Sequence, residues 1–217
     1  KHELWLVMEM VDGKSLTQVI VDAANRPPSH PLEGTRFVLD IMYLMSCDIE
    51  YLHAREFAHL DVTPSNVMVL IERKDGRLCT RLIDFGSARY VAMVGGSRLH
   101  VGTRSKLALT QFYAAPEVVR AVHTPASAHL TPKADIYSFG MIALEMLTGN
   151  PAAYLVSVPY PQRARLLAAV AGLPTSIQSL VLASLEFEPS DRPTAKALRQ
   201  TLGSELNVDR TDGVVPA

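Results

Sequence analysis

The sequence has few cysteines, almost no net charge and no long apolar run. Two cysteines among 217 residues, without a CxxC pair, favour free thiols in a reducing compartment over a disulfide. A formal net charge of −1 provides no overall field for a polyanion, so no nucleic-acid binding is expected. The apolar runs fall well short of the ~20 residues that span a bilayer, and no signal peptide opens the sequence, so no membrane segment is expected. We therefore expect an intracellular protein, placed in the cytoplasm with the nucleus left open.

The common metal-binding and P-loop motifs are absent as well. The seven histidines form no HExxH motif and no paired Cys/His spacing, which argues against structural zinc. Gly13-Lys14-Ser15 resembles the end of a P-loop, but that loop needs a glycine five residues before Gly13, where Met8 stands. The P-loop interpretation is therefore rejected.

The composition that remains is that of a globular domain. Hydrophobic residues make up 48% of the chain and charged residues 20%, a balance unlike that of disordered proteins. At this length we expect one domain, residues 1–202, followed by a loose tail, residues 203–217. The chain begins at Lys1 almost directly with the apolar run LWLVMEM, so we expect a piece of a longer protein.

Local patterns in the first half predict strands around one long helix. Residues 4–10 predict a strand, and the proline-rich residues 26–34 predict a loop. Residues 67–71 and 78–83 predict two strands, and Asp75-Gly76 between them favours an antiparallel hairpin. Ahead of this hairpin, apolar residues recur with helical spacing and form one stripe: Phe37, Ile41, Leu44, Met45, Ile49 and Leu52.

The second half is mainly helical in pattern. Residues 87–110 have weak periodicity and predict a long loop of the functional kind. Apolar residues occupy nearly every side of residues 134–147, so this segment should be a buried central helix. Further helices are expected over residues 163–171, 177–185 and 194–202.

Three short motifs occur in order: HLDVTPSN (residues 59–66), IDFG (83–86) and AAPE (114–117). Their order and spacing resemble the eukaryotic protein kinase family, whose signature is H-R-D-L-x-x-x-N, D-F-G and A-P-E. LVMEMVDGKSL, DIYSFGMIALEMLTG and DRPT match further segments of the family, so the resemblance covers about residues 4–202. It implies an α+β, mainly α-helical fold: a kinase-like C-terminal lobe with a small β-hairpin at the catalytic cleft, the N-terminal lobe being largely missing.

The resemblance also implies catalytic roles. Asp61 matches the aspartate that orients the substrate hydroxyl and accepts its proton, while Asn66 and Asp84 match the oxygen ligands of Mg²⁺. Thr63 stands where the family usually places a lysine that offsets charge on the γ-phosphate. Taken singly, a turn cap at Asp61, an Asx-turn at Asn66 and a strand end at Asp84 are ordinary alternatives. The presence of all three residues at the family's motif positions favours ATP and Mg²⁺ as cofactors.

The same resemblance indicates where a nucleotide would lie. Met8 falls at the gatekeeper position, and Glu9 and Met10 fall in the hinge whose backbone pairs with adenine. Met68 falls under the adenine ring, although an ordinary core methionine is an equally open interpretation. Ser15 falls in the region that contacts the ribose.

Residues around the AAPE motif indicate which side chains would accept the phosphoryl group. Thr110 and Tyr113 match the T-x-x-Y-x-A-P-E run of serine/threonine kinases, which implies that Ser or Thr of a protein substrate is phosphorylated. Glu117 and Arg192 match a buried ion pair of the family, and Asp135 matches an aspartate that braces the catalytic loop. These features disfavour a small-molecule kinase of related fold, and the oligomeric state stays unknown.

Two departures from the family pattern leave an alternative open. Leu60 replaces the arginine that binds an activation-loop phosphate in many kinases, so ordering of residues 87–117 should depend less on phosphorylation. Thr63 offers a hydrogen bond but no charge, which predicts reduced turnover. The alternative is a pseudokinase that acts as a binding or scaffold module, and the retained Asp61, Asn66 and Asp84 argue against it.

The nucleotide clamp of the family is also incomplete in this sequence. No glycine-rich loop and no V-A-x-K lysine occur among the 217 residues, and these parts supply half of the contacts to ATP. We expect these residues by themselves to show little kinase activity and weak ATP affinity.

Overall fold

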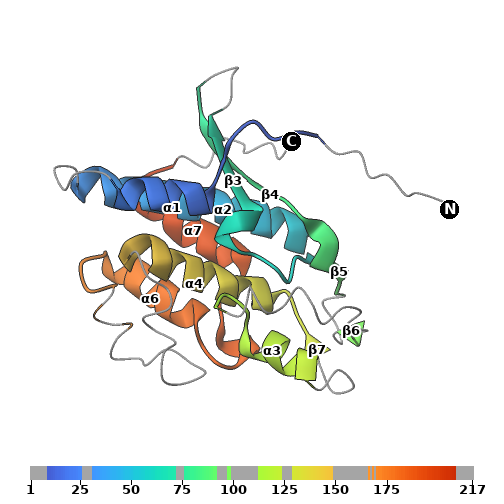
Figure 1. Cartoon of the computed structure of the whole chain (residues 1–217). Coiled ribbons are helices and arrows are strands. Elements are labelled where there is room, and N and C mark those ends of the chain that lie inside the picture. The colour runs from blue at the N-terminus through green and yellow to red at the C-terminus, as the bar shows by residue number, and fades with distance from the viewer. Residues whose placement is uncertain are drawn as a thin grey trace.

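A computed structural model describes residues 9–25, 31–71, 76–91, 97–98, 112–123, 129–148, 166, 168 and 170–208 (Figure 1). Its helices are α1 (Leu16–Ala24), α2 (Pro31–His53), α3 (Pro116–His123), α4 (Lys133–Thr148), α6 (Thr175–Ser184) and α7 (Ala195–Leu206). Its strands are β1 (Lys14–Ser15), β2 (Phe57–Ala58), β3 (Val67–Ile71), β4 (Leu78–Leu82), β5 (Arg89–Tyr90), β6 (Ser97–Arg98) and β7 (His129–Leu130). Short 3₁₀ turns lie at Pro64–Asn66, Phe85–Ser87 and Pro189–Asp191. None of the helices in these ranges is both long enough and apolar enough to cross a bilayer.

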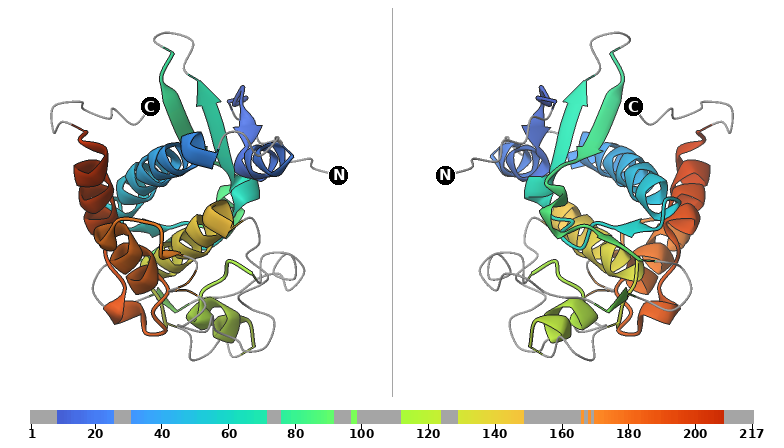
Figure 2. Two further views of the ribbon diagram at one scale, coloured as in Figure 1. Left: turned by 90° about the vertical axis from the view of Figure 1, so that its left-hand side faces the viewer. Right: turned by 90° about the vertical axis from the view of Figure 1, so that its right-hand side faces the viewer.

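Helix α4 is the centre of the core. Every residue from Ala134 to Leu144 is buried, which confirms the prediction of a central helix over residues 134–147. Helices α2 and α6 pack against it, and α4 lies between the β3–β4 hairpin and α3 (Figure 2). Gly140 permits the close approach of α6, because a Cβ there would lie 2.9 Å from two side-chain atoms of Leu185.

Helix α2 is longer and more widely buried than its apolar stripe predicts. It begins at Pro31, within the predicted loop, because proline is tolerated in the first turn of a helix. Phe37 was expected on the buried stripe, but 39% of it is exposed. Ile41, Met45 and Ile49 are fully buried as expected. Helix α2 contacts α7, α4 and β4 at once, so its buried face is broader than one stripe and is concentrated beyond its first turns.

The predicted hairpin is confirmed. Strands β3 and β4 pair antiparallel from Val67↔Leu82 to Ile71↔Leu78, and Gly76 has a φ of +71°, a conformation that favours glycine. Strand β1 adds a third strand on the other side of β3, giving the order β1-β3-β4. The hairpin projects from the helical core, and α1 lies beside it and contacts β3 (Figure 2).

The C-terminal helices confirm the expected elements with different bounds. Helix α7 begins after the N-cap Thr194 and continues through Leu206, so residues 203–206 are helical although a loose tail was expected there. Within the predicted helix over residues 163–171, the described residues 166, 168 and 170 are helical, while residue 171 lies in a turn. The predicted strand at residues 4–10 lies mostly outside the described residues, and Glu9 and Met10 have no regular structure.

The cysteines agree with the expectation of free thiols. Both Cys47, buried on α2, and Cys79, half-buried on β4, are unbridged. The predicted loop over residues 87–110 is described only up to residue 91 and at residues 97–98, where β5 and β6 pair with β2 and β7.

Candidate active site

Asp135 of α4 supports the loop that carries Asp61. Its carboxylate is fully buried and accepts hydrogen bonds from the backbone N–H groups of His59 and Leu60, both at 2.8 Å. The same carboxylate lies 2.9 Å from Nε2 of His53, the last residue of α2. Leu60 adopts a left-handed conformation with a φ of +62°, which is costly for a leucine and persists because its N–H is tied to Asp135. The prediction that Asp135 braces this loop is confirmed.

Asp61 and Asn66 are joined directly. The side-chain Nδ2 of Asn66 donates to the backbone oxygen of Asp61 at 2.9 Å and to its carboxylate Oδ2 at 3.1 Å. These two bonds turn the amide nitrogen of Asn66 toward Asp61, so its oxygen Oδ1 points to the other side. The turn that contains Asn66 is closed by its backbone N–H, which donates to the oxygen of Thr63 at 2.9 Å.

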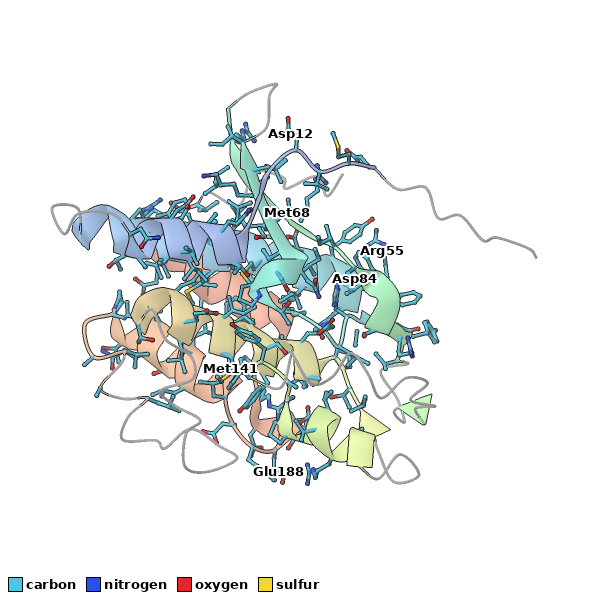
Figure 3. The ribbon with its side chains drawn as sticks, in the orientation of Figure 1. Asp12, Arg55, Met68, Asp84, Met141 and Glu188 are labelled. Carbon is cyan, nitrogen blue, oxygen red and sulfur yellow. The ribbon has the colours of Figure 1, made fainter. Side chains whose placement is uncertain are left out.

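The hairpin brings Asp84 close to Asn66. Its neighbour Ile83 donates its backbone N–H to the oxygen of Asn66 at 2.9 Å, and the oxygen of Ile83 lies 3.0 Å from Nε2 of His59. Asp84 is exposed, has a left-handed φ of +58° and accepts a hydrogen bond from the N–H of Gly86 at 3.3 Å. Figure 3 shows Asp84 beyond the end of β4, at the end of the hairpin nearer the helical core. The three residues predicted from the motifs therefore come from three adjoining segments.

The residues predicted to contact the nucleotide are brought together only in part. Ser15 and Met68 are cross-strand partners of β1 and β3, and Met68 is half-buried on the hairpin (Figure 3). Ser15 also caps helix α1, where its hydroxyl accepts from the N–H of Gln18 at 3.3 Å. Glu9 is exposed and Met10 is 87% exposed. Met8 lies outside the described residues.

Thr63, which stands where the family usually places a lysine, is buried. Only 3% of it is exposed, and its hydroxyl lies 2.9 Å from that of Ser65. Thr63 therefore is buried and has a local hydrogen-bond partner.

Two histidines of the site were missed by sequence reasoning. His53 contacts Asp135, and His59 packs its ring 5.0 Å from that of Phe85 while Nε2 bonds Ile83. Within the described part of the chain, Nδ1 of His59 is buried without a hydrogen-bond partner. A polar residue next to an apolar helical stripe was the only signal for His53, and it does not identify a partner 82 positions away.

Asn66 and Asp84 are suited to bind a hard cation. The described residues contain no group of three or more His, Cys, Asp or Glu side chains placed to hold a metal ion. Mg²⁺ typically takes one or two protein oxygens and completes its shell with water and substrate phosphates. An exposed carboxylate at Asp84 and an amide oxygen at Asn66 fit that partial donor set.

The segment around the AAPE motif is held to α4 by partly buried polar contacts. Tyr113 donates its hydroxyl to Glu145 Oε2 at 2.6 Å, and Ser138 donates to the backbone oxygen of Tyr113 at 2.8 Å. Burial raises the pKa of Glu145, while the bond from Tyr113 acts in the opposite direction. Glu117 and Arg192 form the expected buried ion pair at 2.6 Å. The sequence indicated Tyr113 but contained no signal for its partner Glu145.

Comparison with known proteins places these features in a family. The model of the protein kinase domain family matches residues 1–202. The serine/threonine-protein kinase STE20 of Candida glabrata is 28% identical over 207 residues, which is 91% of this chain and 20% of that protein. The serine/threonine-protein kinase mos of Patiria pectinifera is 35% identical over 144 residues, 66% of this chain and 36% of that protein. PknL of Mycobacterium tuberculosis, also a serine/threonine-protein kinase, is 27% identical over 195 residues, 87% of this chain and 43% of that protein. The chain thus spans less than half of the length of each of these relatives.

Proposed function

The chain belongs to the protein kinase domain family, and we propose that it transfers the γ-phosphoryl group of ATP to serine or threonine hydroxyls of protein substrates. One observation carries the proposal: Asn66 is hydrogen-bonded to Asp61 through its side chain and to Ile83, the neighbour of Asp84, through its backbone. Phosphoryl transfer depends mainly on positioning and on charge stabilisation, and this network positions three oxygen-bearing side chains relative to one another.

Each residue has a distinct role in this proposal. Asp61 orients the acceptor hydroxyl and takes its proton as the oxygen attacks the γ-phosphorus and ADP leaves. Asn66 and Asp84 would hold Mg²⁺, which when bound neutralises charge on the phosphates. Thr63 contributes a hydroxyl in place of a positive charge, so we expect slower transfer than in kinases with lysine at this position.

The nucleotide is proposed to lie along the hinge and the hairpin. The backbone of Glu9 and Met10 would pair with adenine beside Met8, and Met68 would contact the ring from below. Ser15 would lie near the ribose, and its cross-strand pairing with Met68 supports placing both on one ligand. Residues 1–217 include no glycine-rich loop or V-A-x-K lysine, so we expect them to bind Mg-ATP weakly by themselves.

The test is phosphoryl transfer by the intact protein to a panel of Ser/Thr peptides with radiolabelled ATP. Asp61→Asn and Asp84→Asn should each lower kcat by at least about 100-fold, because each removes a charge at the reacting groups. Asp40→Asn is the matched control, since Asp40 pairs with Arg36 on the surface of α2. Asp40→Asn should retain wild-type rates. Equal activity of all three variants would reject the proposed site.

A second candidate function is a binding or scaffold module without transfer activity. The burial of Thr63 and its bond to Ser65 favour it, because no cation takes the place of the usual lysine within the loop of residues 59–66. An intact protein that binds a protein partner but transfers no phosphate in the assay above would support this candidate.

A further inference from the structure

The residues that follow Asp84 are tied to the end of helix α2. Strand β5 pairs antiparallel with β2, with Tyr90 opposite Phe57. Immediately after β5, Val91 is fully buried and donates its backbone N–H to the oxygen of Glu56 at 2.7 Å. Two short strands and one further hydrogen bond therefore set the position of the chain where it leaves the candidate site.

The side chain of Tyr90 adds a contact that the backbone pairing does not require. Its hydroxyl donates a hydrogen bond to the carboxylate of Glu56. Its ring meets the ring of Phe57 edge to face, with centroids 5.5 Å apart. The hydrogen bond to Glu56 raises the pKa of Tyr90, because a phenolate would face a carboxylate. Tyr90 is 54% exposed, so burial alone does not account for its fixed position.

Glu56 also connects this contact to the loop that carries Asp61. Its backbone N–H donates to the oxygen of His53 at 3.0 Å, and the ring of His53 lies 2.9 Å from Asp135. Asp135 in turn accepts the N–H groups of His59 and Leu60. A continuous set of hydrogen bonds therefore runs from Glu56 to the catalytic loop.

The left-handed backbone of Asp84 needs support on both of its sides. That conformation is unfavourable for a non-glycine residue, so flanking contacts help to maintain it. On the upstream side, Ile83 is bonded to Asn66 and His59. On the downstream side, the contacts include the turn Phe85–Ser87, the ring of Phe85 against that of His59, and the pairing of β5 with β2.

Leu60 presents no cation to the segment after Asp84. Its side chain packs against the hydrophobic core, so a phosphate on that segment would gain no ion pair from this position. We propose that the Tyr90–Glu56 contact is a latch that keeps Asp84 in position without phosphorylation of the following segment. Tyr90 and Glu56 are then positioning residues, and their effect on catalysis rests on the proposed kinase function.

Hydrogen exchange of the intact protein tests the latch without requiring activity. Tyr90→Phe keeps the ring against Phe57 and removes only the hydroxyl, so amides of residues 85–91 should exchange roughly three- to tenfold faster. Glu56→Gln keeps an acceptor without its charge and should have a smaller effect. Tyr51→Phe is the matched control, because Tyr51 lies on α2 with its ring under Arg55. Tyr51→Phe should leave exchange at residues 85–91 unchanged.

A kinetic readout separates positioning from general destabilisation. If the latch positions Asp84, Tyr90→Phe should raise the Mg²⁺ concentration needed for half-maximal activity by a similar factor, and saturating Mg²⁺ should restore kcat. Phosphatase treatment of the wild-type protein should leave the protection of residues 85–91 intact. Loss of protection on phosphatase treatment, or wild-type exchange in Tyr90→Phe, overturns the latch. Faster exchange in a protein that transfers no phosphate supports the latch and rejects the proposed function instead.

Discussion

Arg192 and Glu117, which are 75 positions apart, form a buried ion pair with two hydrogen bonds of 2.6 and 2.9 Å. The three other N–H groups of Arg192 donate to the backbone oxygens of Glu186, Lys133 and Phe187, each within 2.9 Å. A guanidinium has five N–H donors, so all of them are partnered. This side chain therefore joins α3, the start of α4 and the segment after α6.

Replacement of Arg192 by lysine should destabilise the protein strongly. An ammonium has three donors and no planar fork, so at least two of the five acceptors lose their partner in a buried site. We expect Arg192→Lys to lower the free energy of unfolding by about 3–5 kcal/mol, measured by urea denaturation. Arg36→Lys serves as control, because 59% of the Arg36 side chain is exposed. A loss below about 1 kcal/mol for Arg192→Lys would contradict this interpretation of the pair.

Asp48 should make stability depend on pH. Burial raises the pKa of Asp48 to about 7, although the bond from Thr80 Oγ1 at 2.6 Å and the charge of Arg81 oppose that rise. A carboxyl group whose pKa is higher in the folded state stabilises the fold when protonated, and this contribution declines as pH rises from about 4 to about 7. Asp48→Asn cannot ionise, so its free energy of unfolding relative to wild type should increase over that window, by up to about 4 kcal/mol.

Urea denaturation of both proteins at pH 4.5, 6 and 8 provides the measurement. Thr80→Val removes the hydroxyl that lowers the pKa of Asp48 and should make the fold less stable at pH 8, where the ionised carboxylate loses its donor. Parallel pH profiles for wild type and Asp48→Asn would show that ionisation of Asp48 is not the source of the pH-dependent stability.

Gly140 and Gly34 should respond in opposite ways to alanine. A Cβ on Gly140 would lie 2.9 Å from Leu185 and 3.0 Å from Ser184, so Gly140→Ala must push α6 away from α4. We expect a loss of about 1–3 kcal/mol in the free energy of unfolding. Gly34 lies in α2, and no atom lies within 4 Å of the position that a Cβ would take there, so Gly34→Ala should gain about 0.5–1 kcal/mol through helix propensity. Thermal melts of the two variants give the comparison, and a stabilised Gly140→Ala would be inconsistent with the close packing of these helices.

Thr63→Lys should accelerate phosphoryl transfer by the intact protein. A lysine would add the positive charge that the loop lacks near the γ-phosphate, and we expect kcat to rise roughly tenfold. Thr63→Met has similar length without charge and controls for disruption, since Thr63 is only 3% exposed. Steady-state kinetics at saturating Mg-ATP would detect the difference. An unchanged or lower kcat in Thr63→Lys, with the fold intact, would count against this role.

Much of the architecture followed from local patterns. The hairpin β3–β4 was predictable because each strand is a contiguous apolar run and Gly76 supplies the turn. Helix α4 was predictable because it is apolar on nearly every side, and α7 because Thr194 begins it. The bounds differ from the predicted ones, since α2 starts inside a proline-rich stretch and α7 continues beyond Leu202.

The candidate site was predictable in its residues and not in its contacts. In the sequence, Asp61, Asn66 and Asp84 are related only through the order of the motifs that contain them. Their roles are proposals. Motif spacing contains no information on the bonds from Asn66 to Asp61 or on the burial of Thr63.

The sequence by itself determined the family, the central helix and the hairpin, because these depend on residues that are adjacent or regularly spaced along the chain. Only the tertiary structure decided that His53 meets Asp135, that Tyr90 meets Glu56 and that Phe37 stays exposed. Such contacts depend on how segments far apart in the chain pack, and local pattern does not encode the distance or the orientation between two surfaces.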